Sequence, residues 1–254
     1  MKEFSLLEKM GIKGIKADFF SGDGQSMINY YQDILEDAAS NHLLVNFHGA
    51  TLPRGWQRTY PNLMTTEAVY GYEMITFNQK DADVAASHMV MSAFARNAFD
   101  PMDFTPVSLY KIPKINRQTS GAFELATSVI FLSGIQHYVE GPEGMSKMSP
   151  EVKRFMQTVP SVWDDVKFID GYPGRYYVVA RRAGKKWYVA GINADTTNRE
   201  ITMDLSFIAP QKTGSIFFSS KDGKMIESGN CDIYAKKKNT ITMQANDGFV
   251  MVFE

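Results

Sequence analysis

Acidic and histidine side chains follow several short apolar runs, at the points where those runs end. Asp18 follows "GIKGIKA", His48 follows "LLVNF", and Glu67 and Glu73 lie six residues apart in "TTEAVYGYE". A carboxylate in such a place can cap a helix, bond loop amides as a structural acid, or act as a nucleophile or base. The pattern around Asp18 leaves these alternatives open.

Two further strand-end side chains, Asp103 in "DPMDFTP" and His137 in "SGIQHYV", belong to the same series. Glycoside hydrolysis needs one carboxyl group that protonates the departing oxygen and another that attacks the sugar or activates water. Clustered acids with loop oxygens are also typical of a calcium site. Ordinary loop acids remain an alternative for Glu67 and Glu73.

The composition excludes several other classes of protein. The chain has 254 residues with a formal net charge of −1, so it has no basic stripe for nucleic acid or an anionic membrane. Cys231 is its one cysteine, which excludes a disulfide framework and a cysteine-based metal site. No apolar run reaches the length of a membrane span, and "MKEFSLLEKMGIKG" lacks the features of a signal peptide.

The elements that would position these side chains alternate over the first two thirds of the chain. Apolar runs typical of strands are separated by segments with helical spacing, which predicts a parallel sheet with crossover helices. Functional side chains in such sheets lie at the carboxyl ends of the strands. We expect about five strands, fewer than the eight of a closed barrel, at 12–20, 43–50, within 60–73, near 98–106 and at 133–144, and helices at 26–40, 82–97 and 119–133.

The last third has a different pattern. A hairpin is predicted over 175–194 with its turn at "RAGKK", followed by "ITMDLSFI", "GSIFFSS", "NTITMQA" and "GFVMVFE". Short strands at this spacing indicate a small antiparallel β-sandwich. The linker is expected in "VWDDVKFIDGYPG", which divides the chain into residues 1–165 and an all-β domain of residues 166–254.

Several longer segments resemble the catalytic domain of glycoside hydrolase family 97. They are "GIKGIKADFFSGD", "LLVNFHGATLPRGWQRTYPNLMTTEAVYGYE", "DPMDFTP" and "VPSVWDD". The family contains α-glucosidases and α-galactosidases built from an N-terminal β-sandwich, a (β/α)8 barrel and a C-terminal β domain. The resemblance therefore implies an α/β fold: the C-terminal part of a TIM barrel, from about strand four to strand eight, followed by the small β domain.

The resemblance also implies roles for single residues. Inverting members carry a glutamate base in "HEA", where this chain reads "HGA" and has Gly49. Retaining members instead carry an aspartate nucleophile, which falls on Asp18. By the same matching, Glu73 falls on the general acid/base. Glu67 falls on a calcium ligand, and Lys16 and His48 fall on substrate-binding positions.

The function implied by this matching is a retaining, exo-acting α-glycoside hydrolase that works by double displacement, in particular an α-galactosidase with Ca²⁺ as cofactor. Phe19 and Phe20 are then expected to form the wall behind the nucleophile Asp18. An α-glucosidase of the same family and a non-catalytic carbohydrate-binding or assembly fragment remain the alternatives. The expected partner is an oligosaccharide or α-galactoside.

The matched segments begin just before the fourth barrel strand of the family. We therefore expect a C-terminal fragment that lacks the N-terminal sandwich, the first barrel strands and one calcium ligand. An incomplete barrel exposes sheet edges and apolar faces, so the fragment is expected to be inactive or to need self-association. The family resemblance suggests that the whole protein is periplasmic or secreted.

Overall fold

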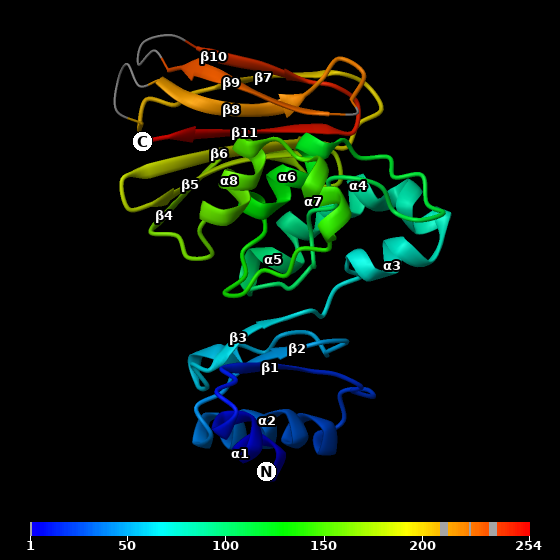
Figure 1. The fold of residues 1–254 in the computed structure, drawn as a ribbon, viewed down its shortest axis with the longest axis vertical. Helices are drawn as coiled ribbons and strands as arrows, with labels where there is room; N and C mark the ends of the chain where they lie inside the picture. The colour runs from blue at the N-terminus through cyan, green and yellow to red at the C-terminus, as the bar shows by residue number, and fades with distance from the viewer. Residues whose placement is uncertain (1, 209–212, 224, 234–237) are drawn as a thin grey trace.

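A three-stranded parallel sheet lies near the N-terminus of the chain in the computed structural model, which describes residues 2–208, 213–223, 225–233 and 238–254. Its strands β1 (Gly14–Ala17), β2 (Leu44–Phe47) and β3 (Leu63–Thr66) lie in the order β1-β2-β3. Helices α1 (Lys2–Lys9) and α2 (Gln25–Ser40) cover one face of this sheet (Figure 1). The predicted first helix and the first three predicted strands are therefore confirmed, each with shorter strand bounds.

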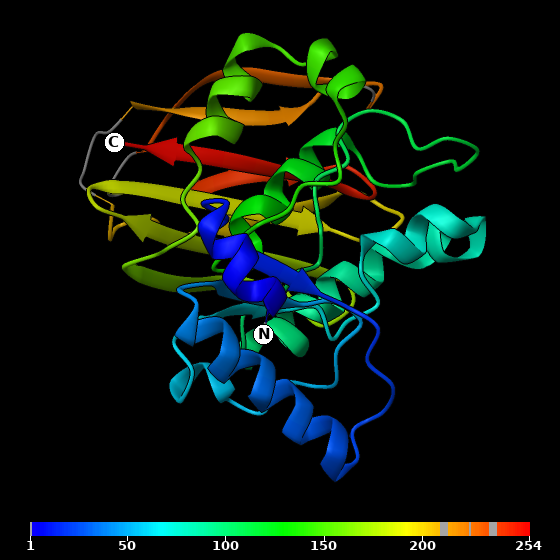
Figure 2. The same ribbon diagram turned by 60° about the horizontal axis from the view of Figure 1, so that its bottom comes forward.

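Helix α2 forms because its apolar side chains share one face. Tyr31, Ile34, Leu35 and Ala38 follow helical spacing and are buried. They pack with buried side chains of β2, including Phe47, in a small core of their own. Figures 1 and 2 show α2 on the side of this sheet that faces away from the antiparallel strands.

The fourth and fifth expected strands do not form as ladders. Thr66 makes an isolated parallel bridge with Met102, and the Met102 amide donates to the Leu132 carbonyl at 2.9 Å. Prolines flank this segment at 101 and 106 and remove backbone donors that a ladder needs. The prediction of a strand over 133–144 is wrong, although the chain there still lies beside β3, where the Ser133 hydroxyl donates to Thr65 Oγ1 at 3.0 Å.

The middle of the chain is helical. The predicted helix over 82–97 is confirmed but breaks at Ala95, and the predicted helix over 119–133 forms with shorter bounds. The elements here are η1 (Trp56–Arg58), α3 (Tyr72–Phe77), α4 (Gln79–Phe94), α5 (Arg96–Phe99), α6 (Gly121–Ile130), α7 (Pro142–Lys147) and α8 (Pro150–Thr158). In the part of the chain that the structure describes, no helix is long and apolar enough to cross a membrane.

A six-stranded antiparallel sheet forms most of the last third. Its order is β4-β5-β6-β11-β8-β9, and a separate antiparallel pair consists of β7 and β10. The predicted hairpin is confirmed, with its turn at Gly184, but the expected linker is instead the edge strand β4. The bounds are β4 (Asp165–Tyr172), β5 (Tyr176–Ala183), β6 (Lys186–Asn193), β7 (Arg199–Met203), β8 (Thr213–Ser219), β9 (Ile226–Asp232), β10 (Asn239–Met243) and β11 (Asp247–Phe253).

The six-stranded sheet is buried on both faces. One face packs against α6 and α4, and Val179, Ala190 and Val250 share a single core with Phe123 of α6. The other face packs under the β7–β10 pair in a second core (Figure 1). The fold is thus a mixed α/β arrangement with a large antiparallel sheet, and the expected division between residues 165 and 166 stays a prediction.

Candidate active site

Two layers of polar side chains form at the carboxyl ends of the parallel strands. Side chains two residues apart in a strand point to the same face, and the strands are in register with Lys16 opposite Asn46. The lower layer therefore holds Lys16 and Asn46. The upper layer, two residues further on, holds Asp18, His48 and Glu67.

His48 is the centre of the upper layer. Its Nδ1 lies 3.2 Å from Asp18 Oδ2, and its Nε2 lies 3.1 Å from both Glu67 Oε2 and Glu73 Oε2. Glu73 arrives from the first turn of α3 rather than from a strand. One imidazole ring therefore has the Asp18 carboxylate on one side and two glutamates on the other.

The contacts of His48 differ in kind. The contact between Nε2 and Glu73 Oε2 is a hydrogen bond, in which the tautomer of the ring decides which atom donates. Glu73 is half-exposed, whereas Glu67 is buried. Burial raises the pKa of Glu67, and the Gly49 amide and the charges of His48 and Lys16 oppose this shift. Glu73 can thus exchange protons with solvent more readily than Glu67.

Each upper-layer residue is followed by a residue in the left-handed region of backbone space. The φ angles are 68° at Phe19, 55° at Gly49 and 40° at Ala68. Side chains other than glycine rarely adopt such angles, and they cost free energy when they do. The turn lets the Phe19 amide donate to Asp18 Oδ1 and the Gly49 amide donate to Glu67 Oε2, both at 2.6 Å. The strained backbone thus holds two of the site's carboxylates in place.

Gly49 leaves space beside Asp18. A Cβ atom added at Gly49 would lie 3.4 Å from Asp18 Oδ1, already in van der Waals contact. A longer side chain there would occupy the volume next to that carboxylate. The glycine in "HGA" therefore keeps one side of Asp18 open.

The lower layer is organised by Asp103. Its Oδ2 accepts from Lys16 Nζ at 2.9 Å and from the Asn46 amide, and it lies 3.0 Å from His137 Nδ1. Burial acts to raise the pKa of Asp103, but the hydrogen bonds from Lys16 and Asn46 outweigh it, so the pKa lies below its usual range. Asp103 is therefore a buried anion that orients the Lys16 ammonium, which remains partly exposed at the site.

A hard cation fits the upper layer in part. Ligand atoms of His48, Glu67 and Glu73 all lie within 4.8 Å of one another. Calcium prefers six to eight oxygen ligands, and the two glutamates supply carboxylate oxygens that converge on one point. The carboxylates fit such an ion, and further oxygens would complete its shell, since a ring nitrogen is a poor calcium ligand.

The structure brings together the five predicted site residues, Lys16, Asp18, His48, Glu67 and Glu73, although their roles stay predictions. The two phenylalanines of the expected aromatic wall lie in different environments, and the wall behind Asp18 stays a prediction. Phe20 stacks on Tyr31 at 4.3 Å in the core beneath the sheet, whereas Phe19 is 95% exposed because its left-handed backbone turns the side chain outward.

Sequence reasoning placed Asp103 and His137 at strand ends but did not assign them to the site, and it missed Asn46 altogether. The signal for Asn46 was available, because it lies two residues before His48 on the same strand, as Lys16 lies before Asp18.

Two family profiles match the chain. Residues 1–69 match glycoside hydrolase 97, and residues 162–254 match the glycosyl hydrolase 97 C-terminal domain, described as an oligomerisation domain. A probable retaining α-galactosidase of Streptomyces bingchenggensis is 39% identical over 185 residues, 73% of this chain and 28% of that protein. A retaining α-galactosidase of Bacteroides thetaiotaomicron is 34% identical over 224 residues, 85% of this chain and 33% of that protein.

A solved structure, the crystal structure of a β-arabinopyranosidase, superposes with a TM-score of 0.94 at 35% identity over 99% of this chain and 41% of that one. The two α-galactosidase relatives are longer proteins, and the chain spans at most about a third of their length. The profiles, the relatives and the superposed structure agree, and the chain belongs to glycoside hydrolase family 97.

Proposed function

We propose that this chain carries the catalytic pair of a retaining, exo-acting α-glycoside hydrolase whose substrate is an α-galactoside. The observation that carries the proposal is that Asp18 and Glu73 both contact His48, with open space at Gly49 beside Asp18. A retaining enzyme needs a nucleophile with unobstructed access to the sugar, and we expect its second carboxyl group about 5–5.5 Å from the first. The names of the two curated relatives support the same substrate and stereochemistry.

In the first step, a carboxylate oxygen of Asp18 attacks the anomeric carbon, and the bond from that carbon to the leaving oxygen breaks. Protonated Glu73 gives its proton to the leaving oxygen, so the sugar remains as an ester on Asp18. In the second step, Glu73 takes a proton from water, the water oxygen attacks the anomeric carbon and the ester bond breaks. Two inversions give net retention.

One residue of each layer binds the substrate in this proposal, Lys16 of the lower layer and His48 of the upper layer. Lys16 offers an ammonium group and His48 a ring nitrogen to sugar hydroxyls, while Asp103 fixes the direction of the Lys16 side chain. Calcium, held by Glu67 and by an oxygen of Glu73, would supply positive charge that stabilises developing negative charge near the sugar. We place these strands in a (β/α)8 barrel that a small C-terminal β-sandwich follows.

Nitrophenyl α-galactoside, nitrophenyl α-glucoside and a calcium chelator test the proposal on the full-length enzyme. We expect hydrolysis of the galactoside, loss of activity with the chelator and recovery with added calcium. Proton NMR should show the α-anomer as the first product. Asp18→Ala should be inactive and should regain turnover with azide, giving a β-linked adduct. Full activity of Asp18→Ala would overturn the nucleophile assignment.

A second candidate substrate is a β-L-arabinopyranoside, because the superposed structure with the TM-score of 0.94 is a β-arabinopyranosidase. This sugar has the ring hydroxyl configuration of an α-D-galactoside but lacks the hydroxymethyl group, so both could occupy one site. The ratio of kcat/KM for nitrophenyl β-L-arabinopyranoside and α-D-galactoside decides between them. A ratio above one would favour the arabinoside.

Self-association through residues 162–254 is also part of the proposal, supported by the description of the matching C-terminal domain. Export of the full-length protein to the periplasm or the cell exterior has only the family resemblance as its support. Light scattering on the purified chain would test association, and a monodisperse monomer would count against it.

A further inference from the structure

The helix that carries Glu73 has a buried anchor. Tyr72 begins α3 and is 1% exposed, and its amide donates to the Phe104 carbonyl at 2.9 Å. Its hydroxyl donates a hydrogen bond to Glu124 Oε1 at 3.3 Å. Helix α3 has six residues, too few to be stable without tertiary contacts. Its position therefore depends on its two buried side chains, Tyr72 and Ile75, and Tyr72 is the one next to Glu73.

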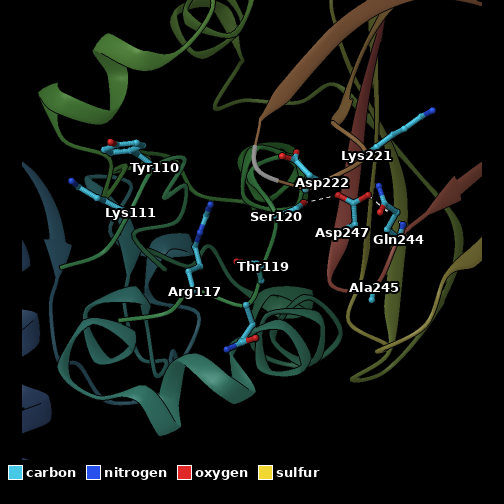
Figure 3. A pocket seen from close by; sticks show the side chains of 12 residues that line it. Tyr110, Lys111, Arg117, Thr119, Ser120, Lys221, Asp222, Gln244, Ala245 and Asp247 are labelled. Atoms are coloured by element: carbon cyan, nitrogen blue, oxygen red, sulfur yellow. Dashed lines mark hydrogen bonds between the residues drawn. The ribbon is translucent and has the colours of Figure 1, made fainter. Parts of the chain in front are cut away.

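Glu124 is fully buried and belongs to a different part of the molecule. It lies on α6, all of whose residues are buried and which packs on the antiparallel sheet. The Ser120 cap at the start of α6 donates to Asp247 Oδ1 of β11 at 2.5 Å, the contact drawn in Figure 3. Glu124 is thus mounted on a buried helix that packs against the antiparallel sheet.

Further donors form hydrogen bonds to the Glu124 carboxylate. Besides the Tyr72 hydroxyl it accepts from the Thr119 hydroxyl and from the Ser108 amide at 3.3 Å. Burial raises the pKa of Glu124, and the nearby charge of Arg117 and these bonds oppose the shift. Arg117 and Thr119 line the pocket in Figure 3, so the far end of this network reaches solvent there.

Ser108 connects Glu124 to a strained loop. Thr105 and Val107 are β-branched residues with φ angles of 53° and 71°, which such residues adopt only when their surroundings impose them. The Ser108 carbonyl accepts from Arg117, and its amide donates to Glu124. This loop follows Asp103 and supplies the Phe104 carbonyl that receives the Tyr72 amide. Glu124 therefore holds both α3 and the loop beside it.

We propose that Glu124 is a positioning residue which, through the Tyr72 hydroxyl, holds α3 so that the Glu73 carboxyl group meets the leaving oxygen of the substrate. The inference rests on the proposed role of Glu73 as general acid. Through this residue, the helix that packs on the antiparallel sheet would affect the position of a carboxyl group at the ends of the parallel strands. Tyr72 and Glu124 are both buried, so we expect them to act through Glu73 and not by touching the substrate.

The test compares two substrates of the full-length enzyme. Methyl α-galactoside needs a proton on its leaving oxygen, whereas α-galactosyl fluoride releases fluoride with little help from an acid. We expect Tyr72→Phe and Glu124→Gln each to lower kcat/KM on the methyl galactoside about tenfold and on the fluoride less than about twofold. The double variant should lose less than the product of the two single losses, since Glu124→Gln acts in part through the same Tyr72 contact. Equal losses on the two substrates, or additive losses, would overturn the proposal.

Tyr176→Phe is the matched control, because it also removes a tyrosine hydroxyl, one that donates to Asp170 Oδ1 at 3.0 Å in the antiparallel sheet. It should leave both substrates unaffected. Hydrogen exchange at residues 72–77 provides a readout that needs no activity and should become about tenfold faster in Tyr72→Phe and Glu124→Gln, but not in Tyr176→Phe. Unchanged hydrogen exchange at residues 72–77 in these two variants would overturn the proposal that Glu124 and Tyr72 hold α3. If the wild type hydrolyses neither substrate, the proposed function fails, and exchange alone decides whether Glu124 holds α3.

Discussion

The parallel and antiparallel sheets use the same charged residue types in opposite ways. In the antiparallel part, Asp195 accepts from Arg175 at 2.9 Å and also pairs with Arg199, so its charge is balanced where it lies. At the ends of the parallel strands, Asp18, Glu67 and Glu73 gather around a single histidine. The cations beside Asp195 hold its pKa low, whereas burial raises the pKa of Glu67 among carboxyl groups that share one histidine.

The two regions also differ in how they are supported. The strands of the parallel sheet have four residues each and share a core with α2. The central strands of the antiparallel sheet are longer, and a core covers each of their two faces. A site on short strands needs other devices to hold its side chains. Here these devices are the left-handed turns after each strand and the Glu124 anchor.

The largest effect expected is on activity. Asp18→Asn should lower kcat/KM for an α-galactoside by about 10⁴-fold, roughly 5 kcal/mol, because the amide cannot attack the sugar. The free energy of unfolding should stay level or rise, since one of several crowded negative charges is removed. Enzyme kinetics and urea unfolding measure the two quantities. A large loss of stability would mean that Asp18 is a structural acid.

The largest effect on stability is expected in the antiparallel sheet. Phe249 is 1% exposed, and its ring lies against Gly191 of the neighbouring strand. Phe249→Ala should lower the free energy of unfolding by about 3–5 kcal/mol. Phe168 of the edge strand is 57% exposed and provides the control, since Phe168→Ala should cost less than about 0.5 kcal/mol. Similar urea midpoints for the two variants would contradict this account of the core.

Two glycines with nearly the same φ angle allow the effect of backbone strain to be separated from the effect of a new side-chain contact. Gly49 and Gly184 have φ angles of 55° and 58°, but only at Gly49 would a Cβ meet another atom, Asp18 Oδ1. Each alanine variant should lose about 1–2 kcal/mol of stability because of the left-handed backbone. Gly49→Ala alone should also lower kcat, by crowding the nucleophile. An equal loss of kcat in Gly184→Ala would show that the effect is not local.

The smallest effect concerns the ion pairs of Asp195. The hydrogen bond from Arg175, with smaller help from Arg199, holds the pKa of Asp195 below its usual range. A carboxyl group with a lowered pKa in the folded state stabilises the fold above the unfolded pKa of about 3.9, and this stability is lost as pH falls through the folded value. Asp195→Asn should cost about 1 kcal/mol at pH 7 and progressively less as the pH falls below about 3.9.

Urea unfolding between pH 3 and pH 7 measures this difference, and Arg175→Gln should remove most of the same pH dependence. Neither variant should change activity, because both lie in the antiparallel part of the molecule. If the free energy of unfolding changed with pH in the same way in the wild type and in Asp195→Asn, the ion pair would contribute nothing to the pH dependence of stability.

Local pattern determined much of this protein. Helical spacing of buried residues predicted α2, and the turn residues of "RAGKK" predicted the β5–β6 hairpin. The identity of strand-end residues placed Asp18, His48 and Glu67 at one edge, because carboxyl ends of parallel strands meet there. These features depend on neighbours in the chain, so the sequence contains them.

Tertiary structure decided the rest. The expected strand over 133–144 failed to form, because pairing depends on backbone donors and registers that an apolar run does not reveal. The linker became strand β4 because β5 offered it an edge to pair with. The position of Glu73 beside His48 depends on Tyr72 and Glu124, 52 residues apart in sequence, and only packing brings such distant groups into contact.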